Sequence, residues 1–164
     1  MSETLSRRAW LRGGFLGTRV EQRRHPQRLL PVLRPPGAAP EAELLAACTG
    51  CGDCMRACPH GVLHPVGARY PGAEGTPSWD PVQAPCRLCT DLPCVAVCPT
   101  RALSPQYGRW MGTARVDVYV CLANAPGGCS VCVEQCPIPG ALIRELGRPV
   151  VAPDSCAGCG ICHH

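Results

Sequence analysis

The chain has 164 residues and a formal net charge of +4, and it holds 18 Gly, 19 Pro and 15 Cys but one Phe, three Trp and three Tyr. An ordinary apolar core would be thin in such a chain, and small folds with thin cores depend on disulfides or metal. The odd number of cysteines and the lack of a cleavable secretory segment argue against a disulfide framework. No stretch approaches the ~18 apolar residues that span a bilayer, so no transmembrane segment is expected.

Positive charge is concentrated near the N-terminus. Residues 1–34 hold eight of the sixteen arginines and two of the twelve acidic residues, a local balance of +6. We therefore expect a basic, proline-rich arm over residues 1–39, followed by a cysteine-rich domain over residues 40–164. Because Trp10 and Phe15 are not interleaved with the arginines as a stacking platform, nucleic-acid binding is not expected.

The arm contains the stretch SRRAWLR at residues 6–12, which is similar to the twin-arginine export consensus. An export signal also needs an apolar segment of ~7 to 15 residues. Here the run after Arg12 is GGFLGT, and Arg19 ends it. We therefore expect the protein to stay in the cytoplasm.

Three elements are expected along the rest of the chain, among short hairpins and single helical turns. Pro40 and the acidic residues after it predict a short helix at the start of PEAELLAAC. The alternation of apolar and polar residues in TARVDVYV, residues 113–120, predicts a half-buried strand. ALIREL and RPVVAPDSC, on either side of Gly147, predict a hairpin that leads to the last cysteines.

From residue 48 onward the chain repeats a cysteine motif, and such repetition indicates duplicated units. The first motif (48–59) reads C-x2-C-x2-C-x3-C-P, and the second (86–99) reads C-x2-C-x4-C-x3-C-P. The third (121–137) reads C-x7-C-x2-C-x3-C-P, and the fourth (156–162) is interrupted after its third cysteine. The cysteines are Cys48, Cys51, Cys54 and Cys58; Cys86, Cys89, Cys94 and Cys98; Cys121, Cys129, Cys132 and Cys136; and Cys156, Cys159 and Cys162.

This spacing is typical of iron–sulfur proteins. Three closely spaced thiolates on one tight loop can wrap a cubane cluster, while the cysteine after x3 points toward a second cluster. A structural zinc site instead uses four ligands in two separated pairs. Gly50, Gly52, Gly158 and Gly160 let the backbone approach the inorganic core. We therefore expect iron bound by all fifteen cysteines, and an α+β, ferredoxin-like polycluster fold with little apolar core.

A family carries the same features. VLRPPGAAPEAELLAACTGCGDCMRACP, CRLCTDLPCVAVCPTRAL, RWMGTARVDVYVCLANAPGGCSVCVEQCP and CAGCG together resemble the NapF/NapG/MauM group of ferredoxin-type proteins. The resemblance covers about residues 32–162. It implies three to four [4Fe-4S] clusters on the fifteen cysteines.

The resemblance also implies a function, and no independent catalysis is expected. The arm without an apolar segment is similar to the NapF type, which is cytoplasmic and helps load or mature the molybdenum-containing catalytic subunit of nitrate reductase. The expected partner is that subunit or its precursor. The alternative is an electron relay between a quinol-oxidising membrane protein and a periplasmic reductase or methylamine dehydrogenase. The middle motifs, which look like those of NapG and MauM members, favour this alternative.

The pairing of motifs is the last expectation. The simplest account of the interrupted fourth motif is a sequence that continues past His164. In paired-cluster ferredoxins the fourth cysteine of one motif ligates the other motif's cluster. Because the first and fourth motifs are compact, we expect a nested pairing in which Cys58 completes the site of the fourth motif, while Cys98 and Cys136 serve the inner clusters. The site of the first motif would then hold a [3Fe-4S] or labile cluster. The alternative, sequential pairing, leaves three thiolates at the third motif.

Overall fold

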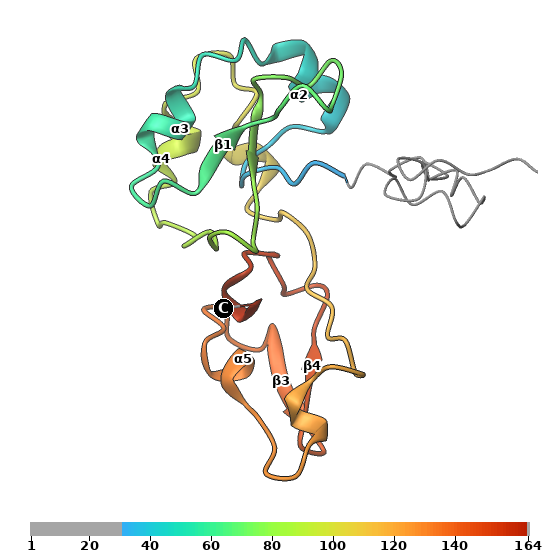
Figure 1. Ribbon diagram of the computed structural model, residues 1–164. Coiled ribbons are helices and arrows are strands. Elements are labelled where there is room, and N and C mark those ends of the chain that lie inside the picture. Colours follow the sequence, from blue (N-terminus) through green and yellow to red (C-terminus); the bar gives the residue numbers. More distant parts are fainter. Residues whose placement is uncertain (1–30, 164) are drawn as a thin grey trace, which may run out of the picture. The chain divides into compact units, whose positions relative to one another are not determined.

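The computed structural model describes residues 31–163 (Figure 1), so the twin arginines and the rest of residues 1–30 lie outside the described residues. Short helices and two small sheets alternate along the chain. In order, the elements are α2 (Glu41–Ala47), α3 (Asp53–Ala57), β1 (Leu63–Pro65), β2 (Pro77–Trp79), α4 (Pro93–Ala96), η1 (Pro105–Tyr107), η2 (Leu122–Asn124), α5 (Val131–Glu134), β3 (Leu142–Glu145), β4 (Arg148–Val151) and η3 (Ile161–His163).

The predicted first helix is confirmed as α2. Pro40 is its N-cap, and Glu41 and Glu43 lie in the first turn. Their negative charges stabilise the helix by interacting with the positive end of its dipole. Leu44 is completely buried on the inner side of the helix. The helix ends because Cys48 has an extended backbone, which turns the chain into the first motif.

The segment before α2 is part of the packed domain. Pro35 and Pro36 are among its most deeply buried side chains. The Gly37 amide donates to the Gly108 carbonyl at 2.8 Å, and the Ala39 amide donates to the Ala102 carbonyl at 3.0 Å. These residues, which the composition groups with the arm, therefore pack beside the segment that follows the second motif.

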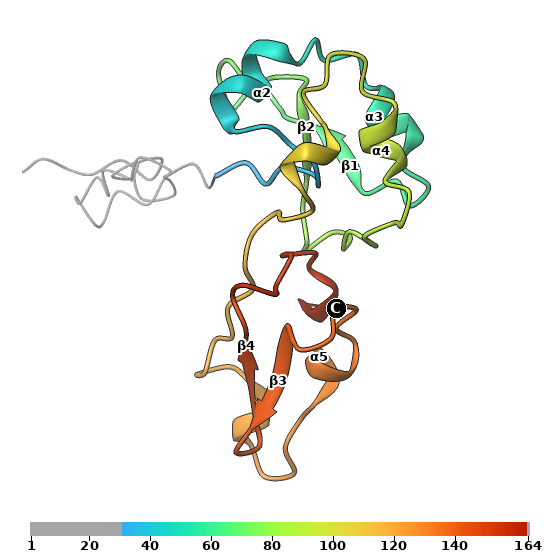
Figure 2. The same ribbon diagram turned by 180° about the vertical axis from the view of Figure 1, so that it is seen from behind.

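A small antiparallel sheet separates the first two motifs. β1 pairs with β2 so that Leu63 faces Trp79, and the Trp79 side chain is 3% exposed. The Trp79 indole N–H donates to the Arg34 carbonyl at 3.1 Å. This hairpin turns the chain back, so that α4 of the second motif packs against α3 of the first (Figures 1 and 2).

The predicted second hairpin is confirmed, whereas the predicted strand over 113–120 is wrong. β3 and β4 are antiparallel, and Leu146 (φ 48°) and Gly147 (φ 83°) form the two-residue turn between them. Positive φ at both turn residues suits the twist of a hairpin. Residues 113–117 have no regular structure and 118–120 form a turn. The alternation there finds no partner strand, and the Tyr119 side chain is exposed.

The fold is therefore a mixture of short helices and two-stranded sheets, as the α+β prediction expected. Its apolar core is small and includes sulfur atoms: four of the buried core residues are Cys54, Cys86, Cys94 and Cys159. In the part of the chain from residue 31 to residue 163, no helix is both long and apolar enough to cross a bilayer.

Candidate metal centre

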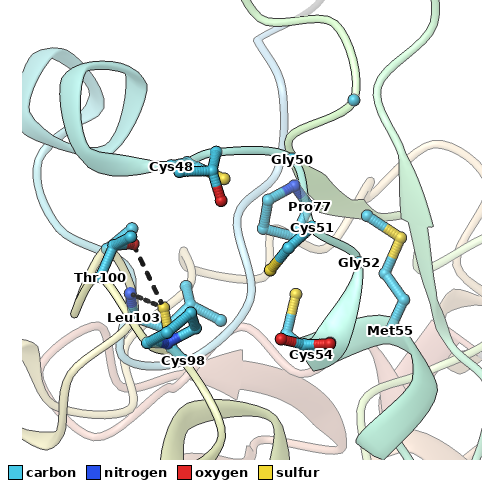
Figure 3. Close-up of a pocket in the computed structure, with 15 residues that line it drawn as sticks. Cys48, Gly50, Cys51, Gly52, Cys54, Met55, Pro77, Cys98, Thr100 and Leu103 are labelled. Atoms are coloured by element: carbon cyan, nitrogen blue, oxygen red, sulfur yellow. Dashed lines mark hydrogen bonds between the residues drawn. The ribbon is translucent and has the colours of Figure 1, made fainter.

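Four cysteines from two motifs surround one cavity, which we call the first site. Cys48, Cys51 and Cys54 come from the first motif, and Cys98 is the last cysteine of the second. Figure 3 shows these four side chains around the same space. The cavity has a volume of about 360 Å³, part of it open to solvent.

The Cys98 sulfur in the first site has two further polar neighbours. The Leu103 amide donates to this sulfur at 3.4 Å, and the Thr100 hydroxyl lies 3.8 Å from it (Figure 3). Hydrogen bonds to a ligating sulfur stabilise its thiolate and are one of the protein's means of setting a cluster's potential. The cysteine spacing did not predict that these two residues would contact the sulfur.

The second site is built in the same way with the motifs exchanged. Cys86, Cys89 and Cys94 of the second motif line a cavity of about 340 Å³ together with Cys58, the last cysteine of the first motif. α3 and α4 pack against each other, and Cys58 and Cys98 each follow closely after one of these helices. Each site thus takes three thiols from one motif and one from the other.

Burial raises the pKa of one thiol in the first site and of two thiols in the second. It raises the pKa of Cys54 to about 11, with a smaller contribution from the neighbouring Cys48, Cys98 and Cys51. It raises the pKa of Cys94 to about 12, and the nearby Cys58 and Cys86 add to the effect. Neighbouring thiolates repel one another and burial disfavours the charged forms of Cys54 and Cys94, so a positively charged core must accompany the deprotonation of each set.

The cysteines of the third and fourth motifs form two more groups. The third group contains Cys121, Cys129 and Cys132, whose thiols interact electrostatically. Cys136, although it belongs to the third motif, interacts electrostatically with both Cys159 and Cys162, whereas Cys132 interacts with Cys162 as well as with the third group. The fourth site therefore combines Cys156, Cys159 and Cys162 with Cys136.

The nested pairing expected from the sequence is wrong. Cys58 lies with the second motif rather than with the fourth, and Cys98 lies with the first motif rather than with the third. The physical reason is the β1–β2 hairpin, which returns the chain to α3 before the second motif begins. The motifs pair sequentially, and the site of the first motif has four thiols.

The donor set fits iron–sulfur clusters. All fifteen cysteines are free thiols. Among residues 31–163, no three His, Cys, Asp or Glu side chains come close enough together to hold one metal ion. The thiols instead line two cavities in sets of four. Four thiolates around such a space are the ligands of a [4Fe-4S] cluster, which supplies one-electron redox chemistry when bound.

One backbone feature recurs in all four motifs. The residue immediately before the second cysteine has a left-handed conformation: Gly50 (φ 68°), Leu88 (φ 50°), Gly128 (φ 67°) and Gly158 (φ 73°). Gly50 and Gly158 were expected from the sequence to serve the sites. Leu88 was missed because leucine rarely adopts this conformation, although its place in the motif could have indicated it.

Comparisons with known proteins agree with this geometry. Residues 47–102, which hold the first and second sites, match the family model described as "4Fe-4S dicluster domain". The chain is 42% identical to the methylamine utilization ferredoxin-type protein MauM of Methylophilus methylotrophus, over 84% of this chain and 67% of that protein. It is 37% identical to the ferredoxin-type protein NapG of Escherichia coli, over 79% of this chain and 64% of that protein.

The chain belongs to the MauM and NapG family of ferredoxin-type proteins. A second MauM, from Paracoccus denitrificans, is 40% identical over 80% of this chain and 65% of that protein. The chain thus spans about two thirds of the length of these ferredoxin-type relatives. No solved structure matches it.

Proposed function

We propose that this chain is a polycluster electron relay that passes single electrons to or from a redox enzyme and has no catalytic site of its own. Its fifteen cysteines would hold up to four clusters. The supporting observation is a direct contact between the two halves of the cysteine set. The Cys86 amide of the second site donates to the Cys159 carbonyl of the fourth site at 2.9 Å.

This contact joins two ligating residues by a single hydrogen bond. The Cys86 and Cys159 side chains are both buried, and their thiols interact electrostatically. The first and second sites exchange one ligand each, and the fourth site takes Cys136 from the third motif. The cysteine groups therefore connect in the order first, second, fourth, third, which suits a relay.

The partners follow from the relatives as part of the same proposal. MauM proteins are named for methylamine utilization. We place this chain between a quinol-oxidising membrane protein and a methylamine dehydrogenase or a molybdenum-containing reductase. The cytoplasmic maturation role of NapF-type members is the alternative. One ground for it is a site with only three thiols; Cys98 completes the site of the first motif, so this ground now rests on the third group.

One experiment separates the relay from the maturation role. The full chain is reconstituted without oxygen, its iron and sulfide are quantified, and it is mixed with the apo-precursor of the catalytic subunit or with the loaded enzyme. A relay retains its iron and exchanges electrons with the loaded enzyme on a millisecond scale. Iron that moves to the apo-precursor, with no electron exchange, would support maturation and overturn the relay.

A further inference from the structure

An arginine outside the cysteine motifs binds the loop of the second site. Arg109 follows η1, and its guanidinium donates to three consecutive carbonyls of that loop. Nη1 lies 3.3 Å from the Leu88 oxygen and 3.2 Å from the Cys89 oxygen, and Nη2 lies 2.8 Å from the Thr90 oxygen. Only the planar fork of an arginine presents several donors in this fixed geometry.

The loop that Arg109 binds is strained. Leu88 has φ 50° and Leu92 has φ 43°, so two leucines occupy a backbone region that disfavours side chains with a Cβ atom. In the first motif Gly50 and Gly52 take the equivalent positions, with φ of 68° and 76°. Glycine adopts this conformation without strain, and leucine does so only when the surroundings hold it in place. The Arg109 hydrogen bonds are such a restraint.

The same segment also reaches the fourth site. The Met111 amide donates to the Ala157 carbonyl at 2.9 Å, and the Ala114 amide donates to the Cys156 sulfur at 3.4 Å. Residues 109–114 therefore bind the loop of the second site at one end and the loop of the fourth site at the other. Arg109 anchors one end of this connection.

Within residues 31–163, no carboxylate forms an ion pair with Arg109. Among the described residues, the ion pairs are Arg34 with Glu41 and Arg56 with Asp53. Arg56 binds the Cys51 carbonyl of the first site at 3.0 Å, so the first site has a comparable arginine that is paired with an acid. Asp91 lies in the loop of the second site, but it forms no ion pair with Arg109 within the described residues. A positive charge near a cluster favours the reduced form, which carries one more electron.

We propose that Arg109 is a positioning residue of the second site. Its side chain holds in place the strained loop that contains Cys89, and it raises the reduction potential of the cluster bound there. The proposal rests on the proposed function, because it needs a cluster at Cys58, Cys86, Cys89 and Cys94. It assigns two separable effects to one side chain: the hydrogen bonds retain the cluster, and the charge sets its potential.

Four variants of the full chain separate these effects. Arg109→Lys keeps the charge and loses the fork, and Arg109→Gln loses both. Arg109→Gln with Leu88→Gly removes the strain that the fork opposes, with Leu88→Gly alone as its reference. Arg69→Gln is the matched control, because Arg69 is exposed and has no hydrogen bond to a cysteine loop among the described residues. The signal of the second site is assigned by its loss in Cys89→Ser.

Two readouts are taken after anaerobic reconstitution: the rate at which an iron chelator removes the cluster, and the midpoint potential from a titration followed by EPR. We expect Arg109→Gln to release the second-site cluster about tenfold faster and Arg109→Lys to release it at an intermediate rate. Arg109→Gln should not accelerate release further when Leu88 is already glycine, so the double variant should release the cluster at the rate of Leu88→Gly alone. The potential should fall in Arg109→Gln and in the double variant, and stay near the wild-type value in Arg109→Lys.

The contrary results are equally specific. Equal release from Arg109→Gln and Arg69→Gln would overturn the positioning role. A potential that falls as far in Arg109→Lys as in Arg109→Gln would overturn the role of charge. A wild-type chain that takes up no iron would overturn the proposed function, whereas a loaded chain that is insensitive to Arg109→Gln would overturn this inference alone.

Discussion

At the scale of single residues, the left-handed positions before the second cysteines differ in the space around them. A Cβ atom on Gly50 would lie 3.7 Å from its nearest neighbour, the Gly75 carbonyl oxygen. A Cβ atom on Gly158 would lie 2.5 Å from the Gly112 carbonyl oxygen, and that oxygen belongs to backbone and cannot easily move. The two sites therefore depend on glycine for different reasons.

This difference gives a matched pair of substitutions. Gly50→Ala should destabilise the loaded protein by about 1–2 kcal/mol, the cost of a left-handed alanine. Gly158→Ala should cost more, because the chain near Gly112 must also shift, and the fourth site should lose iron. Unfolding by denaturant and iron content after reconstitution measure the two effects. Equal effects of the two alanines would contradict the close approach of Gly112 to Gly158.

The buried thiols give a prediction about pH. The pKa of Cys94 is raised from an ordinary value of 9.0 to about 12, mainly by burial. The folded apo-protein thus binds this proton more tightly than the unfolded chain does. The contribution of the protonated Cys94 thiol to the free energy of unfolding is complete below pH 9 and is lost as the pH rises toward 12.

Cluster uptake should show the opposite trend, because the ligands must be deprotonated. We expect anaerobic cluster assembly to accelerate between pH 7 and pH 9 and to release protons, while the apo-protein becomes less stable above pH 9. Absorbance at the cluster's charge-transfer bands and a pH-indicator dye follow the two processes. Assembly that is independent of pH over this interval would contradict the protonated state of the buried thiols.

At the scale of elements, the short helices and sheets are held by a few side chains. The Arg34 side chain is 10% exposed and joins three segments. Its Nε donates to Glu41 of α2 at 2.9 Å, and its Nη1 donates to the Thr76 hydroxyl and the Pro77 carbonyl, each at 2.8 Å. Arg34 lies in the segment before α2, so the cysteine domain depends on residues that precede its first helix.

We therefore expect Arg34→Ala to destabilise the domain by about 3 kcal/mol, because it removes a largely buried charge from its hydrogen-bond partners. Arg34→Lys should recover part of this loss. The hydrogen bond from Arg34 lowers the pKa of Glu41. The stability that this ion pair contributes is therefore present above the ordinary pKa of the carboxyl and is lost as the pH falls through the lowered value. Denaturant unfolding of Arg34→Ala at neutral and acidic pH tests both statements. A wild-type midpoint in Arg34→Ala would contradict them.

The elements that sequence could predict are those whose signal is local. Pro40 with its acidic neighbours defines α2, and Gly147 defines the turn between β3 and β4. The strand predicted from the alternation over 113–120 does not form, because a strand needs a partner and no segment among the described residues pairs with it. Leu88 and Arg109 were missed for a related reason. Leucine gives no local sign of a left-handed backbone, and Arg109 acts on a loop about twenty residues away.

At the scale of the whole domain, the spacing of the cysteines predicts a set of candidate ligands but did not predict which motifs come together. The motifs share a pattern but differ in spacing, and the similarity between the compact first and fourth motifs suggested that they pair. The chain between them decides otherwise. The β1–β2 hairpin, with Trp79 buried at its end, returns the second motif to the first before the third motif begins. Such a return depends on long-range packing, which motif spacing does not encode.

Sequential pairing makes a prediction that the nested arrangement contradicts. Cys98→Ser should alter the same cluster that Cys51→Ser alters, because both residues line the first site. Cys58→Ser should alter the cluster that Cys89→Ser alters, in the second site. Serine replaces a thiolate with a weaker ligand, so the affected cluster should convert to a [3Fe-4S] form or become labile. Mössbauer and EPR spectra of the anaerobically reconstituted variants identify which cluster changes.

Cys136→Ser is the matched control for these variants, since Cys136 is also the last cysteine of its motif but lies with Cys159 and Cys162. It should leave the signals of the first and second sites unchanged and alter the signal that Cys159→Ser removes. If Cys58→Ser altered that signal instead, the first motif would be paired with the fourth. The contact between α3 and α4, from which the exchange of Cys58 and Cys98 follows, would then not exist in the loaded protein.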